Sequence, residues 1–111
     1  MEQEAEKLIN FLKQIREHPS SFFGYQNDLL IVRAYLSGMR TIALKLLGFN
    51  GTVGELVGIE DAAASRRGYS IGNASVISAL KDKGLPDNEI VTELIQTEIE
   101  FWSIYSELLG S

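Results

Sequence analysis

One long apolar stretch, from Asp28 to Leu47, constrains the fold of this chain more than any other feature. It reads DLLIVRAYLSGMRTIALKLL, and at helical spacing its large apolar side chains cover one broad arc. They are Leu29, Ile31, Val32, Tyr35, Leu36, Met39, Ile42, Ala43, Leu46 and Leu47. A helix with so wide an apolar face needs neighbours on two or three sides. The stretch therefore predicts an all-α bundle of four to five helices around a central helix over about 28–47.

Proline and cap signals place the elements before this stretch. A first helix is predicted over about 2–17, because Pro19 disfavours helical geometry at the residue before it. A connection over 19–27 follows, and we expect its two phenylalanines to pack against the core, since exposing them is unfavourable. Asn27 or Asp28 is then the N-cap of the long helix.

The segment 52–69 has weaker signals. Thr52 and Glu55 have the spacing of a capping box, which predicts a short helix over about 53–57. Residues 60–67 favour a second short helix, but its alanines have little side chain to bury. We therefore expect this part to be short, exposed or mobile.

Two helices are predicted in the last third of the chain. Asn73 is a suitable N-cap for a helix through Lys83, and Gly84 is a stop signal. Pro86 then begins a last helix that reaches Leu109. Because no repeat or linker interrupts the pattern, residues 1–111 are expected to form a single helical domain.

Composition narrows the class of protein. The chain has no cysteine, which excludes a disulfide framework and thiolate chemistry. Its net charge of -5 disfavours nucleic-acid binding, which relies on basic surfaces. The N-terminal residues are acidic where a signal peptide is basic, and Arg33, Arg40 and Lys45 argue against a membrane-spanning long helix. We expect a soluble, cytoplasmic protein that binds neither nucleic acid nor membrane.

Catalytic, metal-binding and cofactor-binding motifs are not found in the sequence. The one histidine, His18, has no context that suggests a catalytic base, and a role at a helix end is the simpler interpretation. Arg66 and Arg67 form a lone basic pair, typical of solvated surface. We therefore predict that the protein is not an enzyme and uses no cofactor or metal.

The last helix carries an acidic stripe without any cation. Between Gly84 and Ser111 there is no lysine or arginine. The stripe consists of Glu89, Glu93, Gln96, Glu100, Ser103 and Glu107. It can be a solvated helix face, or a recognition surface for a basic partner. In the second interpretation, the partner-binding residues are Glu89, Glu93, Glu100 and Glu107.

Glu98 lies on the opposite, apolar side of the same helix. A carboxylate in that position needs a partner. Arg33, Arg40 and the tyrosine hydroxyl groups are the candidate donors. We predict a structural polar tie inside the bundle in preference to a catalytic acid.

A short segment resembles a known group of proteins. Residues 15–24, IREHPSSFFG, resemble an I-R-x-x-P-G-M-Y-[apolar]-G motif, with Ser20 and Ser21 in place of Gly-Met. The motif is followed here, as there, by an aromatic-Leu-x-Gly step at 35–38. The proteins that carry it are small bacterial immunity proteins of polymorphic and contact-dependent growth-inhibition toxin systems. The resemblance implies a structural role for the motif and a protein partner.

Three functions remain in competition. The first is an immunity protein that binds a cognate toxin domain stoichiometrically, the toxin being basic, such as a nuclease. The alternative is a small helical adaptor or regulatory subunit with an unrelated partner. A small hydrolase or lyase is the least supported of the three, because no catalytic constellation is visible. A toxin gene beside this one would favour the first.

Overall fold

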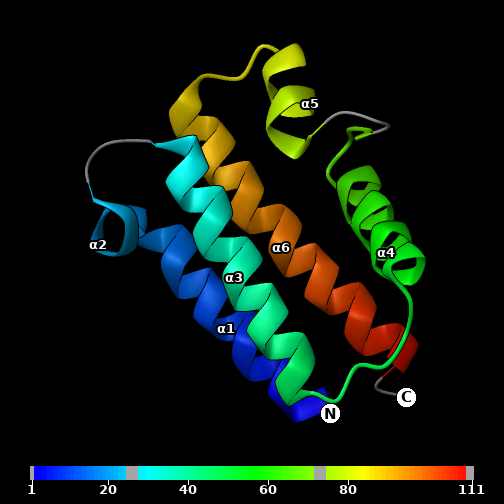
Figure 1. The fold of residues 1–111 in the computed structure, drawn as a ribbon. Coiled ribbons are helices and arrows are strands. Elements are labelled where there is room, and N and C mark those ends of the chain that lie inside the picture. The colour runs from blue at the N-terminus through cyan, green and yellow to red at the C-terminus, as the bar shows by residue number, and fades with distance from the viewer. Residues whose placement is uncertain (1, 25–27, 72–74, 110–111) are drawn as a thin grey trace.

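The computed structural model describes residues 2–24, 28–71 and 75–109, and its regular elements in these ranges are all helices (Figure 1). They are α1 (Glu2–Glu17), α2 (Pro19–Phe23), α3 (Leu29–Leu46), α4 (Val53–Arg66), α5 (Val76–Asp82) and α6 (Asp87–Leu109). The all-α prediction is confirmed, with six helices described instead of four to five. None of these helices has both the length and the apolar character needed to cross a membrane.

The helix at the centre of the molecule is α6, and the prediction of a central helix over 28–47 was wrong. α6 contacts α1, α3, α4 and α5, and Figure 1 shows it running between them. Its largest fully buried side chains are Phe101 and Trp102. By contrast, α3 leaves Ile42 62% and Leu46 83% exposed. An apolar arc shows that a helix can be buried, but the arrangement of the other helices decides which side is covered.

α1 and α2 form the left-hand side of the molecule in Figure 1. α1 ends at Glu17 as predicted, and its buried Leu12 and Ile15 belong to the core. The predicted connection 19–27 begins instead with a helix, since Pro19 suits a first helical turn. The ring of Phe22 contacts Phe11, with centroids 5.7 Å apart. Phe22 is nevertheless 40% exposed, so its predicted packing is only partial.

Asp28 is the N-cap of α3, and Asn27 lies outside the described residues. The Asp28 carboxylate accepts hydrogen bonds from the backbone N–H groups of Leu30 and Ile31. At the other end, Gly48 has a φ of 74°, a left-handed conformation that stops the helix and favours glycine.

α4 is one continuous helix, so the two short helices predicted over 53–57 and 60–67 are joined. It begins with the predicted Thr52–Glu55 capping box. The expectation of a segment with little to bury was wrong for Ala63 and Ala64, which are completely buried, whereas Asp61, Ala62, Ser65 and Arg66 are exposed. α4 lies against α6, and small side chains allow two helix backbones to come close.

α5 is shorter than predicted. Its N-cap is Ser75, whose hydroxyl oxygen accepts from the backbone N–H of Ser78. The predicted cap, Asn73, lies outside the described residues. α6 begins directly after Pro86 and reaches Leu109, as predicted.

Candidate functional site

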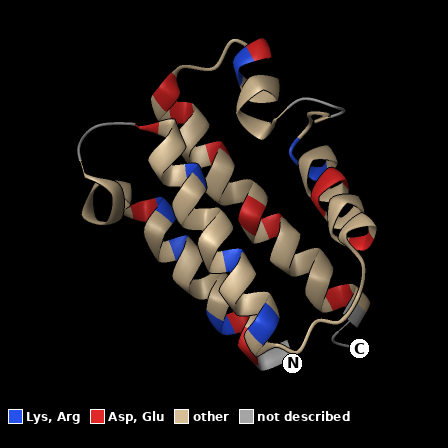
Figure 2. Ribbon diagram, in the orientation of Figure 1, with Lys and Arg blue, Asp and Glu red and all other residues tan. Residues whose placement is uncertain are grey.

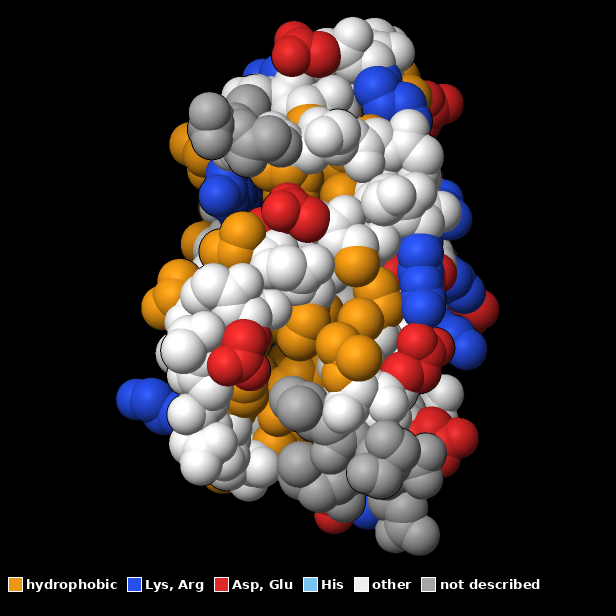
Figure 3. All heavy atoms as spheres, turned by 90° about the vertical axis from the view of Figure 1, so that its right-hand side faces the viewer, with side chains coloured by type: hydrophobic (Ala, Val, Ile, Leu, Met, Phe, Trp, Pro, Cys, Tyr) orange, Lys and Arg blue, Asp and Glu red, His pale blue; other side chains and the backbone are white. Residues whose placement is uncertain are grey.

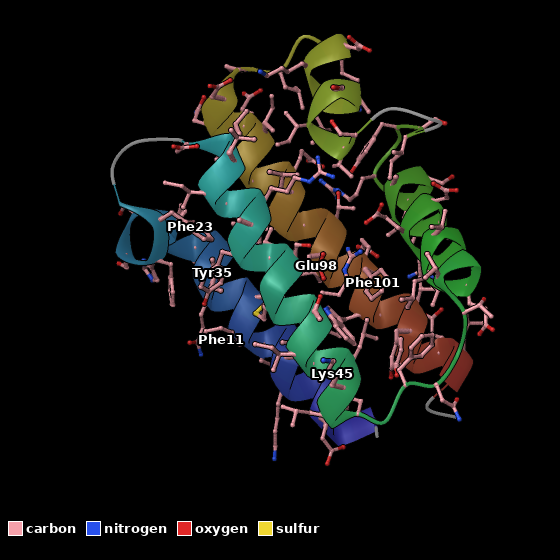
Figure 4. All side chains as sticks on the ribbon, viewed as in Figure 1. Phe11, Phe23, Tyr35, Lys45, Glu98 and Phe101 are labelled. Atoms are coloured by element: carbon pink, nitrogen blue, oxygen red, sulfur yellow. The ribbon has the colours of Figure 1, made fainter. Side chains whose placement is uncertain are left out.

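A partly buried ionic cluster joins three helices. Arg40 on α3 donates from Nε and Nη2 to the two carboxylate oxygens of Glu98 on α6, at 2.9 and 2.5 Å. Its Nη1 donates to Glu60 on α4 at 2.7 Å. Trp102 Nε1 donates to the same Glu98 carboxylate at 3.1 Å. The predicted polar tie is confirmed with Arg40 as the partner, and Figure 4 shows Glu98 among the side chains between the helices.

The surroundings of Arg40 keep its guanidinium group charged. Burial alone would lower the pKa of Arg40, but the hydrogen bonds and charges of Glu98 and Glu60 outweigh it and raise the pKa above its usual value. The guanidinium also lies 3.9 Å from the centre of the Phe101 ring, a favourable cation–π geometry. Since both oxygens of Glu98 accept hydrogen bonds, the carboxylate is occupied in holding the helices together.

A small cavity of about 90 Å³ lies beside the cluster. It is lined by Arg33, Leu36, Ser37, Arg40, Glu60, Val76, Leu94, Thr97 and Glu98. Two cations and two carboxylates balance one another in this lining, and Thr97 already shares a 2.6 Å hydrogen bond with Tyr69. The cavity has room for a few water molecules and has no excess charge that would select an ion.

The predicted acidic stripe faces Arg66, the last residue of α4, and Arg67, the C-cap of that helix. Arg67 donates two hydrogen bonds to Glu93, at 3.0 and 2.6 Å. Arg66 lies 3.4 Å from Glu100 and 2.9 Å from Glu107. Figure 2 shows basic positions at the upper end of α4 and acidic positions along α6. α6 itself therefore has no lysine or arginine, but two arginines from another part of the chain lie beside its carboxylates.

Because of these ion pairs, several carboxylates of the stripe already have partners within the protein. Hydrogen bonds to Glu107 and Glu93 raise the pKa values of Arg66 and Arg67, respectively, against the opposing effect of burial. Three of the four predicted partner-binding carboxylates thus hold α4 against α6, and the fourth, Glu89, is exposed. Their role in partner binding stays a prediction. The arginine pair, interpreted from the sequence as plain surface, is the part of this site that the sequence analysis missed.

An apolar groove lies between α4 and the C-terminal half of α6. It is lined by Glu55, Gly58, Ile59, Ala62, Ile104 and Leu108, and we call it the α4–α6 groove. Its volume is about 260 Å³. Leu108 is 62% exposed, and a side chain built at Gly58 would meet no atom within 4 Å. Figure 3 shows an apolar patch on this side of the molecule with acidic side chains on either side of it.

A second apolar surface runs along α3. Ile31, Tyr35, Ile42 and Leu46 lie one above another on its outer face, and we call them the α3 strip. Their exposed fractions are 56, 39, 62 and 83%. Figure 4 shows Tyr35 on the same side of α3 as the labelled Phe23, whose ring centroid is 5.2 Å away.

His18 occupies the N-cap position of α2 without making a side-chain capping bond, and it is exposed. This agrees with its interpretation as a helix-end residue. In the described ranges no group of histidine and acidic side chains is arranged to hold a metal ion.

The fold and these surfaces define an all-α protein whose α4–α6 groove and α3 strip are exposed apolar surfaces. Comparison of the chain with protein-family models, with curated proteins and with solved structures finds no match.

Proposed function

We propose that this protein is an immunity protein that neutralises a cognate bacterial toxin domain by stoichiometric binding. The observation that carries the proposal is the α4–α6 groove, an apolar hollow beside acidic side chains. Exposed apolar surfaces with a polar rim are typical of protein–protein interaction sites. The resemblance of residues 15–24 to immunity proteins supports a toxin as the partner.

The chemistry of the groove favours a basic, apolar segment of the toxin. Leu108 and Ile59 offer apolar contacts, and Glu55 lies at the rim. The net charge of -5 attracts a basic domain from a distance, which speeds association. Apolar side chains of the toxin that enter the groove would then slow dissociation. Binding would block the toxin sterically, without a chemical step.

The sharpest test compares two variants of equally exposed residues. Leu108 in the groove and Ile42 on the α3 strip are both 62% exposed, so an aspartate at either position should leave the fold intact. The protein encoded by the neighbouring gene, as the candidate toxin, would be expressed with each variant, and binding to it measured by calorimetry. We expect wild type and Ile42→Asp to protect cells and bind one to one, and Leu108→Asp to bind at least tenfold more weakly.

A second variant fills the groove instead of charging it. Gly58→Leu adds a side chain where the groove is open, and it should weaken binding while circular dichroism stays unchanged. If wild-type protein neither protects cells nor binds the toxin domain, the immunity function is wrong. If it binds and both groove variants bind equally well, the function stands and the groove is not the docking site.

A further inference from the structure

The α3 strip has a symmetric spacing. Ile31 and Leu46 lie equally far from the midpoint between Gly38 and Met39, and so do Tyr35 and Ile42. The strip therefore presents large apolar side chains at the same levels when the helix is turned end for end. A two-fold symmetric interface needs this property, because one surface must fit itself.

We infer that α3 pairs in an antiparallel arrangement with α3 of a second copy of this protein. In this pair, Ile31 of each copy lies against Leu46 of the other. Tyr35 lies against Ile42 in the same way, and the two-fold axis passes beside Gly38. The inference does not depend on the proposed function, because the α4–α6 groove is formed by other helices.

Gly38 gives independent support. Glycine weakens the interior of a helix relative to alanine. Nothing inside the protein requires it here, because a Cβ atom at this position would meet no atom within 4 Å. A glycine at the centre of the interface would allow the two α3 backbones to approach closely, which explains a residue that is unfavourable in the single chain.

The exposed area is sufficient for a dimer. A fully exposed residue of this size has an accessible area of about 200 Å². The exposed fractions of the four residues of the α3 strip then correspond to roughly 500 Å² of accessible surface per copy. Phe22 and Phe11 continue the surface through Phe23, which contacts Tyr35, and increase it to roughly 650 Å². Specific interfaces at the small end of the usual range bury about 600 Å² per partner.

The charges on α3 select the antiparallel orientation. The helix has no carboxylate. Arg40 is paired within the protein, Arg33 lines the cavity beside the ionic cluster, and Lys45 lies beside Ile42 and Leu46. In a parallel pair the two Lys45 side chains would lie at the same level of the interface. In the antiparallel pair they lie at opposite ends, roughly 20 Å apart at about 1.5 Å per residue. This separation exceeds the screening length of about 8 Å at physiological salt.

Sedimentation velocity over a concentration series tests the association. We expect wild-type protein to dimerise and Ile42→Asp to be monomeric, with Leu108→Asp as the matched control that dimerises normally. Gly38→Ala should raise the thermal midpoint of the monomer and weaken the dimer about tenfold. A monomeric wild type at all concentrations would overturn the inference and leave the strip to a different partner. Equal association of Ile42→Asp and wild type would move the dimer contact elsewhere.

Cross-linking tests the orientation, because the protein has no cysteine of its own. A mixture of Ile31→Cys and Leu46→Cys chains should form disulfide-linked pairs under mild oxidation. Ile31→Cys alone should not, because the two positions are at opposite ends of the antiparallel interface. Cross-linking of Ile31→Cys with itself, without the mixed product, would overturn the antiparallel arrangement.

Discussion

Arg40 and Glu98 lie 58 residues apart in the sequence and are joined by two hydrogen bonds between guanidinium and carboxylate. Only 5% of the Glu98 side chain is exposed, so the pair is a charged contact in a largely apolar interior. It fixes α3 against α6, and Glu60 extends the contact to α4.

Removing the Glu98 carboxylate should be strongly destabilising. Glu98→Ala leaves Trp102 Nε1 without its acceptor and Arg40 with Glu60 alone, so we expect the free energy of unfolding to fall by about 3–5 kcal/mol. Glu98→Gln keeps one acceptor oxygen and should cost about half as much. Urea unfolding measures both changes. Glu89→Ala on the exposed side of α6 is the control, expected within about 0.5 kcal/mol of wild type.

The two faces of α3 should respond differently to truncation. Leu36 is 4% exposed, and Leu36→Ala should cost about 2–5 kcal/mol because it leaves a cavity. Met39 is only half-buried, so Met39→Ala should cost less. Ile42→Ala on the α3 strip should change the monomer by about 0.5 kcal/mol or less. Similar urea midpoints for Leu36→Ala and Ile42→Ala would contradict the placement of these residues.

The ion pairs between α4 and α6 predict an effect of charge reversal. Glu93→Lys places a cation beside Arg67, so it should lower the urea midpoint and speed hydrogen exchange in α4. Glu89→Lys introduces the same charge at an exposed position and should do neither. Adding Arg67→Glu to Glu93→Lys restores opposite charges and should recover most of the loss. Failure of this rescue would mean that the pair contributes little.

Two tyrosines should make stability fall at alkaline pH. Burial raises the pKa of Tyr69, although its hydrogen bond to Thr97 opposes the shift, and burial also raises the pKa of Tyr105. The folded protein thus retains these protons to a higher pH than the unfolded chain. The free energy of unfolding should decrease as pH rises from about 10 through the raised folded values. The double variant Tyr69→Phe with Tyr105→Phe should show a shallower decrease; an unchanged slope would contradict this cause.

Local signals in the sequence predicted the helix ends well. The Asp28 cap, the Thr52–Glu55 capping box and the glycine stop at Gly84 depend only on neighbouring residues. The choice of the central helix could not be made in this way, because it depends on which elements cover each apolar arc. The buried alanines of α4 show the same limit, since close helix contact favours small side chains that appear to have little to bury.

The candidate surfaces were predictable only in part. The position of Glu98 on an apolar face was enough to predict a hydrogen-bonding partner, and Arg40 was one of the candidate donors. The acidic stripe was correct as a pattern along α6. Its role depends on Arg66 and Arg67, which lie at the C-terminal end of α4 and form ion pairs with it. The α3 strip could not be separated from the core side of the same helix until its neighbours were known.

The central position of α6 has a consequence for how the chain folds. α1 docks against a helix that lies far from it in sequence, as the hydrogen bond between Arg16 and Gln96 across 80 residues shows. A long loop must close, at a cost in chain entropy, before such distant contacts can stabilise the fold. Folding should therefore be slower than in bundles whose neighbouring helices pair first. During synthesis, α1 to α5 must wait for α6 to leave the ribosome before their apolar faces are covered. Until then, the earlier helices expose the surface that chaperones bind and that aggregation exploits.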